Sequence, residues 1–251
     1  LPIYVPLTYS LNNKADNAKS PVKTAVTKKG KEVVQLGFYS HIEIECVNKN
    51  KFYPWPTPDD LDCAELVARH GVLTSIQLQE LGYSSRRLGK LVKKGVLYRY
   101  KVKTPDGSLP SIFTTGYTAQ VIARLPVPRF PDLNELRNLL IINQIIVSIL
   151  LKTEARVNID IGRPVQIVTV NNPFGVMVVR DMFYPKLLHR YGLKQAIAVL
   201  PNEKFALPGM PFRYVLEEEL EHDSFDIKYY YRNQKELVPV DITFKKREND
   251  A

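Results

Sequence analysis

The spacing of apolar residues between positions 73 and 113 predicts two short helices. Thr74 is followed three residues later by Gln77, which is the capping-box pattern of a helix start, and Gly82 ends the first helix. Ser84 is a second N-cap candidate, and the apolar residues of 85–94 recur on one side at helical spacing. Gly95 can adopt the positive φ that closes this second helix.

The segment after Gly95 alternates with the period of two that is typical of a strand. The side chains on one face are Val96, Tyr98, Tyr100 and Val102, and those on the other are Leu97, Arg99, Lys101 and Lys103. Pro105, Asp106 and Gly107 supply a turn, and residues 111–114 return as the partner strand. A further helix is predicted over 61–70, opened by Asp59 and Asp60. Together these elements predict a winged helix-turn-helix.

Basic residues gather on the outer faces of this unit and make it a candidate DNA-binding surface. The candidate contact residues are Ser85, Arg86, Arg87, Lys90, Lys93, Lys94, Arg99, Lys101 and Lys103. Because no Asp or Glu occurs between positions 81 and 105, we expect an unneutralised positive surface that attracts phosphates. Such residues also occur on solvated helix faces with no ligand, and winged helices also serve as protein-interaction modules, so both alternatives stay open.

The remainder of the chain mixes predicted helices and strands, so the fold class is α+β. The longest helix, 132–152, is apolar on nearly all sides, which indicates either the spine of the second domain or a dimer contact. Strands are predicted at 157–161, 165–170, 176–179, 196–200, 212–218 and 238–244, a helix at 185–191 and a turn at 171–175. The predicted domains are an N-terminal extended segment with a Lys-rich arm and a Pro-rich linker (1–58), the winged helix (59–125) and an α/β domain with a small mixed sheet (126–251).

Composition narrows the function without deciding it. The 251 residues carry a formal net charge of +9 with a pI near 9.4. This charge suits a nucleic acid, although an anionic membrane or an acidic protein would be attracted equally. Cys46 and Cys63 are too few for a disulfide framework, which favours a reducing, cytoplasmic compartment. No apolar run approaches the roughly 20 residues of a membrane span, so we expect no membrane partner.

The sequence offers one candidate metal site and no nucleotide-binding motif. His41, Glu43 and Glu45 alternate along a predicted strand, 32–47, and their side chains are of the kinds that bind Mn or Zn. A polar outer face on a half-buried strand explains the same pattern. The sequence lacks the glycine-rich loops that bind nucleotide phosphates and the common hydrolase motifs, so no cofactor, metal or catalytic residue is predicted.

The order of these parts resembles the replication-relaxation family of DNA-binding proteins. The resemblance lies in the end of the winged helix at Gly116-Tyr117-Thr118, the Pro-rich connection and the long helix LRNLLIINQIIVSIL. The plan is also similar to that of winged-helix antitoxins of abortive-infection systems. The replication-relaxation resemblance implies a restriction-endonuclease-like second domain.

Two departures from that family's acidic pattern bear on catalysis. Leu200-Pro201-Asn202 stands where Pro-Asp would, and Glu219 stands where an active enzyme has Lys. A nuclease needs charged ligands for its metal ion, so the nuclease-like core is expected to be degenerate and the protein is not expected to be an enzyme.

The function expected from the sequence is recognition of double-stranded DNA, with a possible homodimer formed through 126–251. The protein would act as a transcriptional regulator or as a replication or mobilisation accessory protein of a plasmid, phage or conjugative element. One alternative is a metal-dependent nuclease or nickase that uses Glu217 and Glu219. Another is an antitoxin-like interaction module in which the acidic run 217–226 meets a basic partner.

Overall fold

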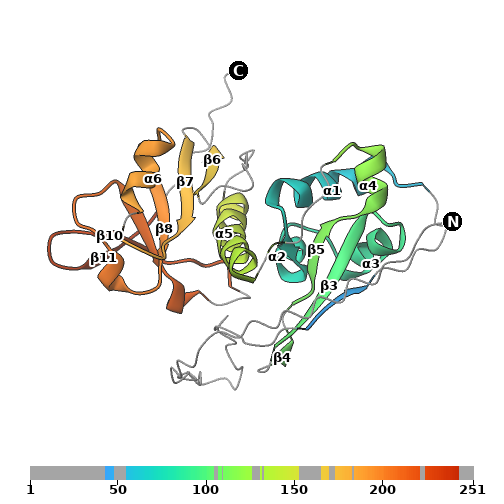
Figure 1. Cartoon of the computed structure of the whole chain (residues 1–251), viewed down its shortest axis with the longest axis horizontal. Helices are drawn as coiled ribbons and strands as arrows, with labels where there is room; N and C mark the ends of the chain where they lie inside the picture. The colour runs from blue at the N-terminus through green and yellow to red at the C-terminus, as the bar shows by residue number, and fades with distance from the viewer. Residues whose placement is uncertain are drawn as a thin grey trace, which may run out of the picture.

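The chain folds as a mixed α+β structure in which one long helix lies between two sheets (Figure 1). The computed structural model describes residues 43–47, 55–104, 107–108, 110–125, 131, 133–152, 165–169, 173–182, 184–220 and 224–242. The long helix is α5, Leu133–Lys152. The predicted α+β class is confirmed.

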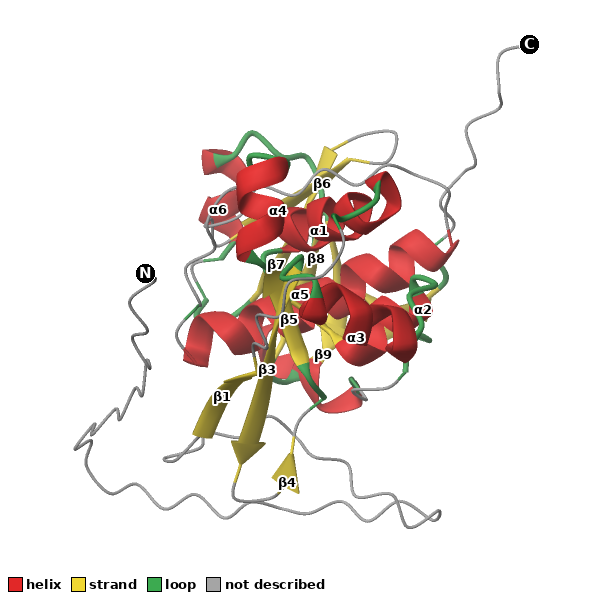
Figure 2. Cartoon of the chain, turned by 90° about the vertical axis from the view of Figure 1, so that its right-hand side faces the viewer, coloured by secondary structure: helices red, strands yellow, loops and turns green. Residues whose placement is uncertain are grey.

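The first sheet is antiparallel throughout and carries four helices, which together we call the first unit. Its strands are β1 (Glu43–Val47), β2 (Leu73–Thr74), β3 (Leu97–Thr104), β4 (Gly107–Ser108) and β5 (Ile112–Thr115), in the order β1-β3-β5-β2 with β4 paired to β3. Its helices are α1 (Pro58–His70), α2 (Ser75–Glu80), α3 (Ser85–Lys93) and α4 (Tyr117–Ile122). The β1, β3 and β4 strands extend beyond the helices as an arm (Figure 2).

Capping explains where the helices of the first unit begin. The Thr74 hydroxyl accepts from the Gln77 backbone N–H at 3.1 Å while the Gln77 side chain accepts from the Thr74 N–H, so the predicted capping box is confirmed. Ser84 caps α3 as predicted, and Gly95 has a φ of 69°. The prediction for α1 was wrong at its start, since a reciprocal Thr57–Asp60 box begins the helix at Pro58, a residue that the first helical position tolerates.

The second sheet has six strands in sequential order. They are β6 (Val165–Thr169), β7 (Pro173–Val178), β8 (Ala196–Leu200), β9 (Phe212–Leu216), β10 (Tyr229–Arg232) and β11 (Leu237–Val240). The β7, β8 and β9 strands are parallel, whereas β6, β10 and β11 pair antiparallel to their neighbours. The connection from β7 to β8 runs through α6 (Pro185–Arg190), and η1 (Glu203–Phe205) and η2 (Glu217–Glu219) are short 3-10 turns.

Several expectations for this half are corrected. Residues 173–175 belong to β7 and not to a turn, and 217 and 218, which were predicted as strand, belong to η2. The β10 strand was not predicted. The predicted strand 157–161, and the predicted cap of α5 at Asp132, lie outside the described residues.

Helix α5 is buried because it packs on both sheets. Along one side Ile145 and Ile149 join a core that includes Val199 of β8. Along another side Leu136, Leu139 and Leu140 pack with Val72, Val102 and Ile112 of the first unit. The apolar sides of α5 are therefore covered by this chain's own two sheets, which confirms the predicted burial of the helix. The homodimer stays a prediction.

Buried polar side chains fasten α5 to the first unit. Nδ1 of His70, at the end of α1, lies 3.0 Å from Oδ1 of Asn143 on α5, and Asn143 Nδ2 donates to the His70 and Val72 carbonyls. Gln77 Nε2 donates to the Leu140 carbonyl at 3.2 Å. Burial lowers the pKa of His70 to about 4, although the Asn143 bond partly opposes this. His70 is therefore neutral at pH 7.

The length and composition of α5 also match those of a membrane span, over Asn134–Lys152. However, 67% of that stretch is buried inside the protein, as in the core helix of a soluble protein. The helix is thus accounted for by packing within the chain.

Candidate nucleic-acid interface

The outward side of α3 presents a row of basic side chains to solvent. The helix buries Leu88, Leu91 and Val92 against the core that includes Cys63 and Val67 of α1, so its opposite side faces outward. Arg86, Lys90 and Lys93 fall on that side at spacings of four and three residues, and all three are exposed. The α3 sequence contains no acidic residue.

The nine predicted contact residues divide into three groups by exposure. Five are exposed: Ser85, Arg86, Lys90, Lys93 and Lys101. Three are partly buried: Arg87, Lys94 and Arg99. The side chain of the ninth, Lys103, lies outside the described residues. The exposed members of α3 therefore form the accessible part of the predicted surface, together with Lys101 on β3.

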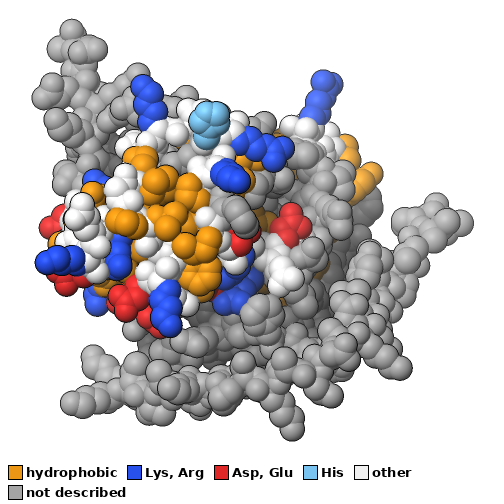
Figure 3. Space-filling model, turned by 60° about the vertical axis from the view of Figure 1, so that its left-hand side comes forward, with side chains coloured by type: hydrophobic (Ala, Val, Ile, Leu, Met, Phe, Trp, Pro, Cys, Tyr) orange, Lys and Arg blue, Asp and Glu red, His pale blue; other side chains and the backbone are white. Residues whose placement is uncertain are grey.

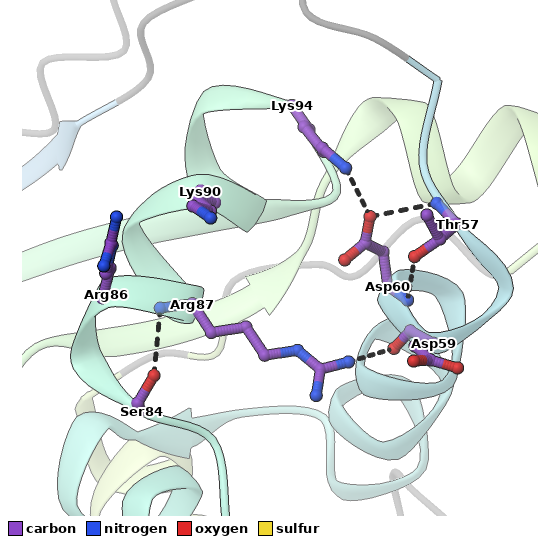
Figure 4. Close-up of a pocket in the computed structure, with 8 residues that line it drawn as sticks. All are labelled: Thr57, Asp59, Asp60, Ser84, Arg86, Arg87, Lys90 and Lys94. Carbon is purple, nitrogen blue, oxygen red and sulfur yellow. Dashed lines mark hydrogen bonds and ion pairs between the residues drawn. The ribbon is translucent and has the colours of Figure 1, made fainter.

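An open hollow of about 500 Å³ lies between the start of α1 and α3 (Figure 4). Its lining is entirely polar or charged: Thr57, Asp59, Asp60, Ser84, Arg86, Arg87, Lys90 and Lys94. Arg87 crosses it, because its Nη2 donates to the Asp59 carbonyl at 2.9 Å and its guanidinium carbon lies 5.0 Å from the centroid of the Tyr83 ring. The Arg87 guanidinium is thus held in place from two sides.

Lys94 has a structural partner that the sequence analysis missed. Its Nζ lies 2.7 Å from Asp60 Oδ2, and the two side chains are only 17% and 12% exposed. Burial raises the pKa of Asp60, but the hydrogen bonds from Lys94 and Thr57 outweigh burial and leave the pKa below its usual value. The expectation of an unneutralised surface is therefore wrong at Lys94, because the acid comes from a helix 34 positions earlier.

The arm also brings acidic positions next to basic ones. In the antiparallel β1–β3 pair, Glu43 is opposite Lys103 and Glu45 is opposite Lys101. Residues directly opposite each other in such a pair are neighbours, so two lysine positions of β3 each adjoin a glutamate position. The expected unneutralised surface rested on the absence of acids between positions 81 and 105, a range that does not include these two glutamate positions.

The metal hypothesis gains no support from the described residues. His41 lies outside them, and Glu43 and Glu45 lie in β1 beside β3. No group of three His, Cys, Asp or Glu side chains that could hold a metal ion occurs in the part of the chain that the structure describes.

A second charged cluster lies just past the ends of β7 and β9, and it includes Glu217, one of the acidic positions of the nuclease resemblance. Oε2 of Glu217 lies 2.7 Å from Arg180 Nη1, and its other oxygen accepts from Arg137 on α5. Arg180 Nη2 also donates to Asn138 Oδ1 at 2.8 Å. Both oxygens of this carboxylate are therefore engaged by guanidinium groups.

The other two residues of the nuclease resemblance, Glu219 and Asn202, also make hydrogen bonds within the protein. Glu219 accepts from the Tyr230 hydroxyl at 2.7 Å, and burial together with this carboxylate raises the pKa of Tyr230 to about 12. Asn202 caps η1 by accepting from the Lys204 backbone N–H at 3.1 Å. Each side chain that the nuclease alternative requires thus has a role within the fold.

Comparison with known proteins found no match. No protein-family description, no characterised protein and no solved structure matched this chain.

Proposed function

We propose that this protein binds duplex DNA through a winged helix-turn-helix made of α1–α3 and the first sheet. Support comes from the element order, which runs α1, β2, α2, α3, β3 and β5. The helix α3 then stands where a recognition helix stands, after a tight turn and ahead of the antiparallel strands. The role that fits best is that of a transcriptional regulator, or of a replication or mobilisation accessory protein of a plasmid, phage or conjugative element.

The observation that carries the proposal is the exposed basic row of Arg86, Lys90 and Lys93 on a helix without acidic residues. An α-helix fits the major groove, where Arg and Lys donate to guanine and where both also reach backbone phosphates. The arm receives a smaller part in binding, because glutamates of β1 stand opposite its lysines.

The second sheet is proposed to act as a body that supports the DNA-binding unit, with a nuclease-like but non-catalytic core. In support, Glu217 is held by Arg137 and Arg180 and would have to leave both to bind Mg²⁺. Asn202 offers no charge for a metal ion.

Selection from a random-sequence duplex pool with the full chain tests the proposal. We expect enrichment of a defined sequence at an ionic strength of about 0.15 M, and an affinity that falls steeply as salt rises, because phosphate binding releases counterions. A chain that enriches no duplex and shifts no DNA even at about 0.05 M salt would show that the proposal is wrong.

A further inference from the structure

We propose that the hollow between α1 and α3 seats one phosphodiester group of the DNA backbone, held by Ser84, Arg87 and Lys90. The inference rests on the proposed DNA binding and adds which side chains contact the backbone. It assigns Arg87 and Lys90 to a contact with the DNA backbone that is independent of base sequence. Arg86 and Lys93 are then the members of the exposed basic row that take no part in this contact.

Hydrogen-bond donors remain available at this hollow. The Ser84 hydroxyl accepts from the Arg87 backbone N–H at 3.3 Å, and its own proton is left to donate. Arg87 uses an Nη2 proton for the Asp59 carbonyl, and a guanidinium has five N–H donors. Lys90 is exposed at the rim and brings an ammonium group (Figure 4). Hydroxyl, guanidinium and ammonium groups all donate hydrogen bonds to phosphate oxygens.

Arg87 is also preorganised for such a contact. The Asp59 carbonyl fixes one end of its guanidinium, and the Tyr83 ring lies 5.0 Å from its centre. An arginine that is already held loses less side-chain entropy when it binds an anion than a free one does. The same restraints keep the Arg87 guanidinium beside α1.

The charge of the hollow suits a single negative charge. Four of the lining residues are cationic and two are acidic, and Lys94 is taken up by Asp60. At the start of α1 the N–H groups of Thr57 and Asp60 are each satisfied by the other's side chain, and Pro58 has no N–H. Side-chain cations, and not the end of α1, therefore supply the attraction.

The lining favours a backbone phosphate over a free nucleotide. All eight lining residues are polar or charged, so the hollow has no aromatic ring in its lining on which a base would stack. It is also open to solvent and lies directly beside the exposed row of α3. A phosphodiester of a duplex lying along α3 meets both conditions.

The experiment is a double-mutant cycle between the protein and the DNA. The selected duplex is prepared with one neutral methylphosphonate at each backbone position in turn, and its affinity is measured for the wild type, Arg87→Gln, Lys90→Gln and Lys93→Gln. At one phosphate per binding site, neutralisation is expected to weaken wild-type binding roughly 10-fold. The same neutralisation should change the affinity of Arg87→Gln and Lys90→Gln less than about 2-fold, because their contact is already lost.

Lys93→Gln is the matched control, since Lys93 is an exposed lysine of the same helix that does not line the hollow. It should keep the full loss at that phosphate. Melting temperatures identify any variant that is misfolded, and Lys90→Gln carries the test if Arg87→Gln is unstable. If the effects of the protein substitution and of phosphate neutralisation add at every backbone position, the phosphate site in the hollow is wrong while DNA binding remains. If the wild type binds no duplex, the proposed function itself is wrong.

Discussion

Two charged clusters of this protein use similar side chains to opposite effect. Around α3, cations outnumber acids, and Arg86, Lys90 and Lys93 reach solvent. At the ends of β7 and β9, two arginines meet a single carboxylate, and the Glu217 side chain is only 13% exposed. The first cluster keeps donors for a ligand, whereas the second satisfies itself and joins α5 to the second sheet.

The difference shows that pairing and exposure decide what a charged cluster can do. Glu217 and Asp60 are both acids beside basic residues, yet Asp60 removes only Lys94 from its cluster, while Glu217 engages both arginines of its own. A ligand that approaches Arg86, Lys90 or Lys93 breaks no ion pair that the structure describes. A metal ion that approaches Glu217 would have to break two ion pairs, which is costly for partly buried groups.

Reversing the charge of the α3 cluster should give the largest effect. Arg86→Glu combined with Lys90→Glu is expected to lower the affinity for the selected duplex about 1,000-fold, because two charge-assisted contacts are lost and repulsion is added. Fluorescence anisotropy at fixed salt measures this.

The control for that pair is Lys204→Glu combined with Lys235→Glu, which changes the net charge equally on exposed residues of the second-sheet half. It should reduce affinity by less than about 3-fold, through the long-range field alone. Equal losses in both pairs would mean that net charge, and not the α3 cluster, binds DNA.

Low pH should weaken the attachment of α5 to the first unit, where His70 is buried against Asn143. In the unfolded chain His70 has a pKa near 6.5, whereas in the folded protein its pKa is about 4. The contribution of neutral His70 to the free energy of unfolding is therefore fully present above pH 6.5 and is lost as the pH drops toward 4. The expected loss is about 3 kcal/mol. Urea denaturation across this range measures it, and His70→Gln should lack this contribution although it is less stable at pH 7.

Amide hydrogen exchange as a function of pH tests whether α5 couples the first unit to the second sheet. Because α5 packs on both sheets, amides of the first unit and of the second sheet should lose protection together as the pH falls. Independent opening of the two would show that α5 does not couple them.

Removing the carboxylate of the second cluster should change stability and leave binding intact. Glu217→Gln is expected to cost about 2 kcal/mol, because Arg137 and Arg180 lose their shared counter-charge in a partly buried place. Denaturant unfolding measures the cost, and DNA affinity should stay within about 2-fold of wild type. If the wild type nicks plasmid DNA with Mg²⁺ and Glu217→Gln does not, the Glu217 cluster is a catalytic site and the nuclease alternative is supported.

The smallest effect is expected where a paired cation is released. Asp60→Asn keeps a capping oxygen for α1 but removes the charge that faces Lys94, so we expect a loss of about 1 kcal/mol in stability. The free Lys94 ammonium should raise DNA affinity about 2-fold at low salt. The variant Lys94→Gln, measured in parallel, should show the stability loss without the gain in affinity.

Local signals in the sequence were enough to predict much of the first unit. The caps at Thr74 and Ser84 and the glycine at 95 act over a few residues, so the bounds of α2 and α3 follow from the chain itself. The apolar residues around α5 likewise predict its burial, although not that two different sheets bury it.

Contacts between distant segments could not be predicted in this way. The pairing of Lys94 with Asp60, and of β3 with β1, depends on the tertiary fold, and a count of acids near α3 in the sequence does not include them. The η2 turn is similar, since residues 217–219 leave the strand where Glu217 meets arginines from α5 and β7. Strand β10 was missed because Tyr229, Tyr230 and Tyr231 show no alternation of apolar and polar residues.

The shared position of α5 limits how this chain can be divided or recombined. A fragment that stops at Leu125 would expose Val72 and Ile112 to water and leave Gln77 without the Leu140 carbonyl. A fragment that keeps α5 but lacks the second sheet would expose Ile145 and Ile149 instead. We therefore expect neither piece to be soluble alone, and a graft of the first unit into another protein must bring α5 together with a new apolar partner for its far side.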